Sequence, residues 1–385
     1  MANEDTVLKL LPNAGVSLVN IHPMLQPYSR LCDRTELRPP HPKTTKPIVL
    51  LGAGGIVQAA HLPAYERAGF PVIGIADRQP GKAAKVAAER SIPNSFESVD
   101  EAIRFAPKDA VFDIAVPASQ LLPILKRMPF EAVILMQKPM GETLQEARAI
   151  RDLCRDRGFI AAVNFQLRYA PNHLGAVALS KAGVLGEVHD IEVQVRTYTP
   201  WHLWEFLASA PRLEILYHSI HYLDLARAWL GEPVGIYAKT VRNPLCGKLA
   251  ATKTSMVLDY GDEKRVFIAT NHGHDFPPES QCSFVQWEGM NGAVRMEMGV
   301  NLDYPVGRPD TLSFAERGGL KWVDVPVTGN WFPDAFAGTM GALQAYVEGS
   351  AAELPTSFES AYRTMQLVEA AYRSSERGGE PMPID

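Results

Sequence analysis

The sequence has few cysteines, and they are far apart. Cys32, Cys154, Cys246 and Cys282 show no C-x-x-C spacing, so neither a disulfide framework nor a zinc site is indicated. No apolar run approaches the roughly 18 residues that span a bilayer. The chain start also lacks a basic segment followed by an apolar core, so we do not expect a secretory signal. These absences favour a protein of the reducing cytoplasm.

The sequence also lacks an excess of positive charge. It has 38 Lys and Arg against 43 Asp and Glu, which gives a net charge of −5. Nucleic acids and anionic membranes attract basic surfaces, so neither is an expected partner. The remaining composition, 46% hydrophobic and 21% charged, is that of an ordinary globular protein. At about 100–200 residues per domain, 385 residues are enough for two domains.

A glycine-rich stretch organises the first half of the chain. The apolar run from Ile48 predicts a buried strand, Gly52-Ala-Gly54-Gly55 predicts a tight turn, and residues 55–69 have the content of a helix. Gly52 permits a sharp bend, and Gly54 lets the backbone approach a ligand pyrophosphate that a Cβ would repel. The phosphates would then lie on free N–H groups at the positive end of the helix.

The turn alone is weak evidence, because Val57, after Ile56, occupies the third position of the G-x-G-x-x-G fingerprint. However, residues 71–77 predict a second apolar strand that ends in Asp77, near the spacing at which a carboxylate reaches the adenosine ribose. Such a carboxylate favours NAD because it repels a 2′-phosphate. Arg78 beside it could bind that phosphate or stack on adenine, so use of NADP stays open.

Strands continue to alternate with helices up to residue 165, which predicts a parallel sheet covered on both faces. Ligands bind at the carboxyl ends of such strands, where Val116-Pro117 and Gln137-Lys138-Pro139 fall. Thr143 and Glu146 form a capping box for one of the helices. The expected helices are 81–90, 100–105 and 143–157, and the later strands are 110–116, 131–136 and 159–165.

The second half separates its helices from a run of strands, which indicates an α+β domain on a large, mostly antiparallel sheet. We expect helices at 171–182 and 213–230, and a last helix at 356–377 that opens with a capping box, Thr356-x-x-Glu359. The expected strands are 188–198, 236–242, 252–259, 265–270, 283–288, 292–297, 311–315 and 320–326.

These patterns predict three parts. Residues 47–166 form a Rossmann dinucleotide-binding domain with a doubly wound parallel sheet, and residues 167–385 form a C-terminal domain for substrate binding and oligomerisation. The last helix could pack back on the Rossmann domain. Residues 1–46, which end in a proline-rich segment, are either a loosely ordered tail or an arm that packs on this or a partner subunit.

Together the motifs resemble the Gfo/Idh/MocA oxidoreductases, named for glucose–fructose oxidoreductase, inositol dehydrogenase and a rhizopine-catabolism protein. The resemblance covers residues 47–385. It rests on the glycine turn, Asp77, Val116-Pro117, Gln137-Lys138-Pro139, Asn164 with Arg168 and Pro171, Tyr217-His218-Ser-Ile-His221-Tyr-Leu-Asp224, and residues 370–378.

The resemblance implies NAD(H) or NADP(H) as cofactor, a sugar-like or polyol substrate, and a homodimer or homotetramer formed through the C-terminal sheet. The implied cofactor-binding residues are Gly52, Gly54, Gly55, Ile56, Val57, Asp77, Arg78, Val116, Pro117, Gln137 and Lys138. The implied substrate-binding residues are Lys138, Arg168, Tyr217, His218 and His221.

Oxidation of an alcohol requires a hydride acceptor and a group that takes the hydroxyl proton. Lys138 could stabilise the reacting oxygen as a point charge, although a loop lysine is often only solvated. His221 is the expected general acid–base because imidazole changes charge near neutral pH, although a lone helical histidine is often a packing residue. Lys138, His221 and Tyr217 are thus the candidate catalytic residues.

Tyr217 departs from the family pattern, which has an aspartate four residues before the histidine, on the same helical face. A phenol can hydrogen-bond the imidazole but cannot balance its positive form. Either Tyr217 contacts the substrate directly, or the proton transfer is arranged differently and involves His218. Gln137 is a second departure, because the family has Glu-Lys-Pro at this place.

Other candidates have two interpretations each. Arg168 could contact an anionic group or form a surface ion pair. The aromatic loop Trp201, His202 and Trp204 suits a sugar ring but also ordinary packing. His272-Gly-His274 has too few neighbouring ligands for a metal site, so we expect no metal.

The sequence therefore predicts a cytoplasmic NAD(P)-dependent dehydrogenase that acts on CH–OH groups of a sugar, a polyol such as an inositol, or a sugar acid. Two alternatives stay open: a redox-neutral enzyme that keeps its NAD(P) tightly bound, and a non-catalytic NAD(P)-binding regulator. Reduction of an oxo or imine group would use the same residues in the opposite direction.

Overall fold

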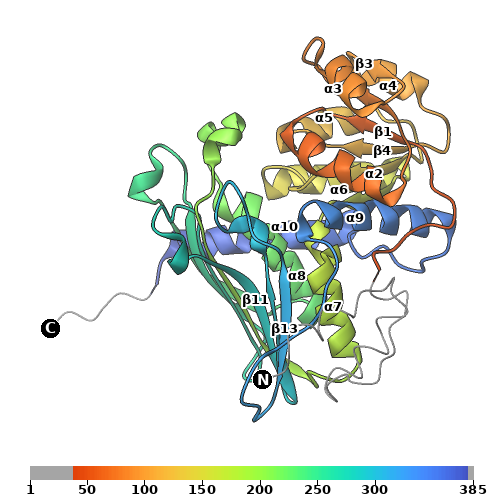
Figure 1. The fold of residues 1–385 in the computed structure, drawn as a ribbon. Coiled ribbons are helices and arrows are strands. Elements are labelled where there is room, and N and C mark those ends of the chain that lie inside the picture. The colour runs from red at the N-terminus through yellow and green to blue at the C-terminus, as the bar shows by residue number, and fades with distance from the viewer. Residues whose placement is uncertain (1–37, 380–385) are drawn as a thin grey trace.

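A computed structural model describes residues 38–379, which form two sheets with helices packed around them (Figure 1). The first sheet has the order β3-β2-β1-β4-β5-β6, and all its neighbours are parallel. Its strands are β1 (Ile48–Leu51), β2 (Val72–Ala76), β3 (Ser95–Phe96), β4 (Val111–Ile114), β5 (Val133–Met136) and β6 (Ile160–Val163). This is the Rossmann-type sheet that the sequence predicts.

The central strands of this sheet are buried along their whole length because helices cover both faces. All four residues of β1 and of β4 are buried. The helices that follow the strands are α2 (Leu62–Ala68), α3 (Lys82–Arg90), α4 (Val99–Phe105), α5 (Leu121–Leu125) and α6 (Leu144–Arg157). The predicted cap of α6 is present, since Thr143 Oγ1 accepts the Glu146 N–H at 3.1 Å.

The second sheet has the order β14-β13-β12-β11-β7-β10-β9-β8. Its neighbours are antiparallel except for β7 and β10, which pair in parallel. The strands are β7 (Val188–Arg196), β8 (Gly235–Val241), β9 (Lys253–Asp259), β10 (Arg265–Asn271), β11 (Cys282–Gly289), β12 (Gly292–Glu297), β13 (Thr311–Glu316) and β14 (Val323–Asp324). The mostly antiparallel sheet is therefore confirmed, with β14 shorter than predicted.

Helices α7 (Pro171–Lys181) and α8 (Ile220–Leu230) pack on one face of this sheet. Figure 1 shows α9 (Trp331–Glu348) and α10 (Phe358–Arg377), both in blue, between the two sheets. Helix α10 contacts β8 as well as α6, so it joins the two halves of the molecule. No helix within residues 38–379 is long and apolar enough to cross a membrane.

Two local predictions were wrong. The cap of α10 is Ser357, whose side chain accepts the Ser360 N–H at 3.3 Å, and Thr356 is buried one residue earlier. The predicted helix 213–230 is also interrupted, because Ile215–Ser219 forms a π-helical turn before α8 begins at Ile220. Such turns insert a residue into the helical register, and they are frequent at functional sites.

The segment just before β1 packs along α9. The Lys43 and Thr44 N–H groups donate to the Glu348 carboxylate at 2.9 and 3.0 Å, and the Lys46 N–H donates to Gln344 Oε1 at 2.7 Å. A Cβ at Gly341 would overlap the Pro40 carbonyl, so this close approach depends on glycine. The end of the predicted N-terminal arm is thus docked on its own chain, and residues 1–37 lie outside the described part.

Candidate active site

The glycine turn after β1 has the shape of a dinucleotide cradle. Gly52 has a φ of +114°, and an added Cβ would overlap the Ala115 carbonyl of the neighbouring strand end. By contrast, nothing in the described part of the chain lies within 4 Å of a Cβ added at Gly54 or Gly55. This open space in front of two backbone N–H groups is where a pyrophosphate is held in Rossmann domains. The turn therefore fits NAD or NADP.

The residues around the turn hold it in place. The Val57 and Gln58 N–H groups donate to the Gly54 carbonyl at 3.1 and 3.2 Å, and Ile56 begins the π-helical turn Val57–His61. Val57, which stands where the fingerprint has its third glycine, is fully buried against the sheet. A valine can take this place because its side chain points into the core.

Asp77 lies directly after β2 and is bound to the glycine turn. Its carboxylate accepts the Ala53 and Gln79 N–H groups, each at 2.9 Å, and the Lys82 ammonium lies 3.4 Å away. Burial works to raise the pKa of Asp77, but these donors outweigh it and the pKa falls below its usual value. The carboxylate is thus charged, while the exposed Arg78 and Lys82 flank it with positive charge; its contact with a ribose stays a prediction.

The remaining predicted cofactor residues lie at one edge of the parallel sheet. Val116 and Pro117 follow β4, and Gln137 follows the neighbouring strand β5. Gln137 is buried, and its Oε1 accepts the Asn164 Nδ2–H at 3.0 Å. This bond fixes the direction in which the chain leaves β5, and Lys138 is the next residue.

Lys138 reaches from the Rossmann sheet to the π-helical turn of the second half. Its Nζ donates to the Tyr217 carbonyl at 2.5 Å. Burial lowers the pKa of Lys138 to about 8, because removal from water disfavours the charged form. Within residues 38–379 no carboxylate forms an ion pair with it. The ammonium therefore stands at the strand edge without a counter-charge.

His218 and His221 lie close to this ammonium. Burial, followed by the charge of Lys138, lowers the pKa of His221 well below its usual range, and its exposed fraction is only 5%. The pKa of His218 is lowered in the same way by burial and then by His272, Lys138 and His221. The structure thus brings three predicted site residues into one electrostatic cluster, with both imidazoles neutral at neutral pH.

Tyr217 does not orient His221. Because the turn is π-helical, Tyr217 faces the Glu142 carboxylate and the Phe206 ring, whereas His221 faces Phe165 and Trp331. Burial, and then the charge of Glu142 and a hydrogen bond to it, raise the pKa of the Tyr217 phenol. Its hydroxyl stays protonated. The expectation that residues 217 and 221 share a helical face therefore fails, since it assumed regular α-helix.

Sequence reasoning missed a buried carboxylate nearby, Glu214. Its Oε1 accepts the Ser219 hydroxyl at 2.7 Å and lies 3.3 Å from His272 Nε2. Burial acts to raise the pKa of Glu214, yet hydrogen bonds from His272, Thr254 and Ser219 bring it below the usual value. The His272 ring lies 4.4 Å from that of His218, centre to centre. No spacing in the sequence links residues 214 and 272, which the turn and the end of β10 bring together.

The two histidines of His272-Gly-His274 have different partners. His272 Nδ1 lies 2.9 Å from Thr199 Oγ1, and His274 Nε2 lies 2.8 Å from Ser280 Oγ. Trp201 is buried with its ring edge against His218, 4.9 Å between centres, while His202 is exposed. Trp201 therefore packs in the cluster, and its contact with a substrate stays a prediction.

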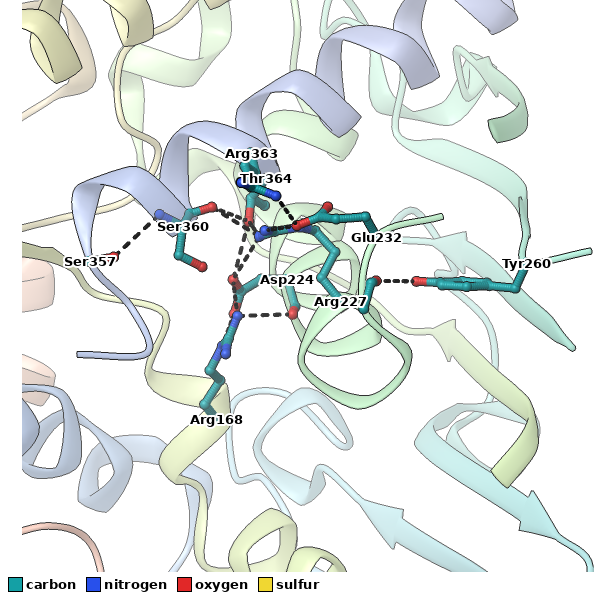
Figure 2. A network of polar contacts seen from close by, with 10 residues as sticks. Arg168, Asp224, Arg227, Glu232, Tyr260, Ser357, Ser360, Arg363 and Thr364 are labelled. Atoms are coloured by element: carbon teal, nitrogen blue, oxygen red, sulfur yellow. Dashed lines mark hydrogen bonds and ion pairs between the residues drawn. The ribbon is translucent and has the colours of Figure 1, made fainter. Parts of the chain in front are cut away.

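Arg168 lies in a network that connects α8 to α10 (Figure 2). Its guanidinium binds the Asp224 carboxylate through two hydrogen bonds, at 2.6 and 2.8 Å, and both side chains are largely buried. Arg227 extends the network to Glu232 and Thr364. The described contacts of Arg168 are thus structural, and its role in substrate binding stays a prediction.

A second buried network, also missed by sequence reasoning, lies beside the site at the ends of β4 and β6. His61 Nδ1 lies 2.7 Å from Asp113 Oδ2, and both side chains have no exposed surface. Tyr65 donates to the same oxygen at 2.7 Å. Asn164, which holds Gln137, also accepts the Thr339 hydroxyl of α9 at 2.5 Å. These bonds fix the strand edge from which Lys138 projects.

The two sheets and the glycine turn are those expected of an oxidoreductase with a dinucleotide-binding Rossmann sheet. Residues 46–165 match the model of the oxidoreductase family described as having an NAD-binding Rossmann fold, GFO_IDH_MocA. The chain is 26% identical over 321 residues to D-apiose dehydrogenase of Rhizobium rhizogenes, with 80% of this chain and 89% of the relative covered. It is 25% identical over 342 residues to D-xylose 1-dehydrogenase (NADP(+)) 2 of Haloferax volcanii, with coverages of 86% and 97%.

Among solved structures, an oxidoreductase from Agrobacterium radiobacter in complex with NAD+, L-tartaric acid and magnesium is similar in fold. The TM-score is 0.72 at 20% sequence identity, and the match covers 87% of this chain and 98% of that one. The family model over residues 46–165 and these relatives thus support a Gfo/Idh/MocA oxidoreductase, as the motifs indicated.

Proposed function

We propose that this protein is an NAD(P)-dependent dehydrogenase that moves a hydride between the nicotinamide ring and a CH–OH carbon of a sugar, polyol or sugar acid. The observation that carries the proposal is the meeting of Lys138, His218 and His221 at the strand edge that also holds the glycine turn. The sugar dehydrogenases similar to this chain over most of its length support the substrate class.

The residues can be given roles from their charge states. The bound nicotinamide would accept the hydride from the alcohol carbon. His221, neutral at neutral pH, takes the hydroxyl proton on its imidazole nitrogen as the C–O bond becomes a carbonyl. Lys138, which is mainly protonated below a pKa of about 8, stabilises the negative charge that develops on the oxygen. His218 is the alternative proton acceptor. Its ring lies against that of His272, which in turn lies 3.3 Å from the Glu214 carboxylate.

Gly52, Gly54, Gly55, Ile56 and Val57 would hold the pyrophosphate, and Asp77 would bind the ribose. We propose NAD as the preferred cofactor because the Asp77 carboxylate is charged and repels a 2′-phosphate. Arg78 supports NADP as a second cofactor, in line with the cofactor named for the Haloferax volcanii relative.

We further propose a cytoplasmic homodimer or homotetramer formed through the large sheet. On its strand β8, Tyr237 and Val241 are 67% and 43% exposed. The substrate-binding domain, residues 167–385, would then provide the contact between subunits.

The experiment begins with purified, untreated protein. Any bound nucleotide is released and identified by mass, and then aldoses, inositols and sugar acids are screened for reduction of NAD and of NADP. Nucleotide-free protein that turns over one class of alcohol supports the dehydrogenase. Stoichiometric bound nucleotide without net reduction would support the redox-neutral enzyme, and nucleotide binding without any turnover would support the regulator.

A further inference from the structure

We propose that the substrate is an acidic sugar, an aldonate or a uronate, whose carboxylate is held by Lys138 together with His218, beside the hydroxyl group that His221 deprotonates. The inference rests on the proposed dehydrogenase function and names the substrate class within it. It comes from the balance of charges around the site, which the following observations establish.

The cluster has basic groups from three parts of the chain. Lys138 comes from the loop after β5, His218 from the π-helical turn, and His221 from α8. His272 joins them from the end of β10, with its ring against that of His218. Basic groups therefore face the site from four segments of the chain.

The nearby carboxylates are all engaged elsewhere. Glu142 is hydrogen-bonded to the Tyr217 hydroxyl, and Glu146 accepts the Glu142 N–H at 2.7 Å. Glu214 is fully buried against Ser219 and His272. Gln137, the residue before Lys138, and Tyr217, whose carbonyl Lys138 binds, also have uncharged side chains. No acid of residues 38–379 is thus left to balance the ammonium.

Free donors and acceptors remain in the cluster. An ammonium has three donors, and the Tyr217 carbonyl accepts one of those of Lys138. His221 Nδ1 is buried and has no hydrogen-bond partner in the described part of the chain. A buried polar atom without a partner is costly, so a ligand that bonds to it gains affinity.

A carboxylate satisfies these requirements better than a hydroxyl group. It supplies the missing negative charge, and its oxygens accept several charge-assisted hydrogen bonds, which are stronger than neutral ones. An anion among the three basic groups also raises the pKa of each imidazole. The acidic substrate would thus make His221 a stronger base at the moment when the hydroxyl proton must leave.

The test compares pairs of ligands that differ mainly in one carboxylate. Binding of D-glucuronate and D-glucose, and of D-gluconate and D-sorbitol, is measured by calorimetry with the full-length protein, both free and saturated with NADH. We expect each acid to bind at least tenfold more tightly than its neutral partner. Above pH 8 the acid should lose affinity as Lys138 deprotonates, with about tenfold weaker binding for each further pH unit.

Gln137→Glu is the matched variant, because a carboxylate can still accept the Asn164 N–H but brings negative charge next to Lys138. It should weaken binding of both acids at least tenfold, and by more than it weakens binding of the neutral partners. The control is Gln366→Glu on α10, where the side chain is exposed. This variant should change the affinity for neither the acids nor their neutral partners.

The outcomes separate the two proposals. If glucose and sorbitol bind as well as or better than the acids, or if no acid binds, the acidic-substrate inference is wrong whatever the protein does with nucleotides. Equal effects of the two Gln→Glu variants would also overturn it. If NADH does not bind, the proposed dehydrogenase function fails, and acid binding to the free protein still decides the inference.

Discussion

Two groups of charged side chains meet at α8 with opposite arrangements. In the first, Asp224 lies between Arg168 and Arg227, and the positive charge of Arg227 is also balanced by Glu232 (Figure 2). In the second, the partly buried ammonium of Lys138 lies near the buried, neutral His221 without a carboxylate partner. Compensated charges fix a fold, whereas uncompensated charges are maintained where a ligand supplies the missing partner. The difference separates the structural network of this helix from the proposed catalytic cluster.

The largest effect is expected from removing the central charge of the compensated group. Asp224→Asn leaves two largely buried guanidinium groups without their shared carboxylate, and should lower the free energy of unfolding by about 3–5 kcal/mol. Urea denaturation measures this value. The control is Asp303→Asn, which breaks the more exposed pair with Arg308 and should cost about 0–1 kcal/mol. Equal losses in the two variants would mean that Asp224 is not a structural centre.

In the uncompensated group the expected loss is in turnover. His221→Asn removes the proposed proton acceptor and should lower kcat by about 10²-fold or more, with nucleotide affinity unchanged. His218→Asn serves as the comparison and should have a smaller effect. Steady-state kinetics with the substrate found in the screen distinguish the two. A larger loss in His218→Asn would transfer the acid–base role to the pair of His218 and His272.

Removal of the uncompensated charge should stabilise the fold. The pKa of Lys138 is about 8 in the folded protein and 10.5 in its ordinary state, so the folded state disfavours the proton that the unfolded chain keeps. Below pH 8 this difference costs stability, and the cost disappears as pH rises from 8 to 10.5. Lys138→Met should therefore raise the free energy of unfolding at pH 7 by about 1–2 kcal/mol. A destabilised variant would show that the ammonium is compensated after all.

The smallest effect is expected at Asp77, whose charge is compensated by Lys82 and two N–H groups. Asp77→Ala should reduce the preference for NAD over NADP by about tenfold, or 1.4 kcal/mol, since it removes the ribose acceptor and the repulsion of a 2′-phosphate. Fluorescence titration with both reduced cofactors measures this change in preference. Arg78→Ala is the complementary variant and should weaken the binding of NADP alone. An unchanged ratio in Asp77→Ala would place ribose recognition elsewhere.

The parallel sheet could be predicted from the sequence because its signals are local. The apolar run from Ile48, the glycines that follow it and the acid at Asp77 lie within about 30 positions, and each strand and helix has its own start and stop residues. The edge that carries Lys138 follows from this topology alone, since the carboxyl ends of parallel strands lie together.

The charge balance of the site could not be predicted in the same way. The partners of Asp224, Glu214 and Tyr217 come from distant segments, and the sequence contains no pattern that pairs residue 214 with 272 or 217 with 142. The π-helical turn had no recognisable signal either, so the assumption of regular helix placed Tyr217 and His221 on one face. Arg168 was recognised as a candidate, but its partner Asp224 was visible only in the fold.

The most direct test of the account is a single-turnover measurement with Lys138→Ala. Protein saturated with NAD is mixed with the substrate from the screen, and nicotinamide reduction is followed by absorbance, with nucleotide affinity measured in parallel. We predict that the variant binds NAD as the wild type does and reduces it about 10²–10³-fold more slowly, because the charge that stabilises the reacting oxygen is gone. Reduction at the wild-type rate would contradict the assignment of this cluster as the active site.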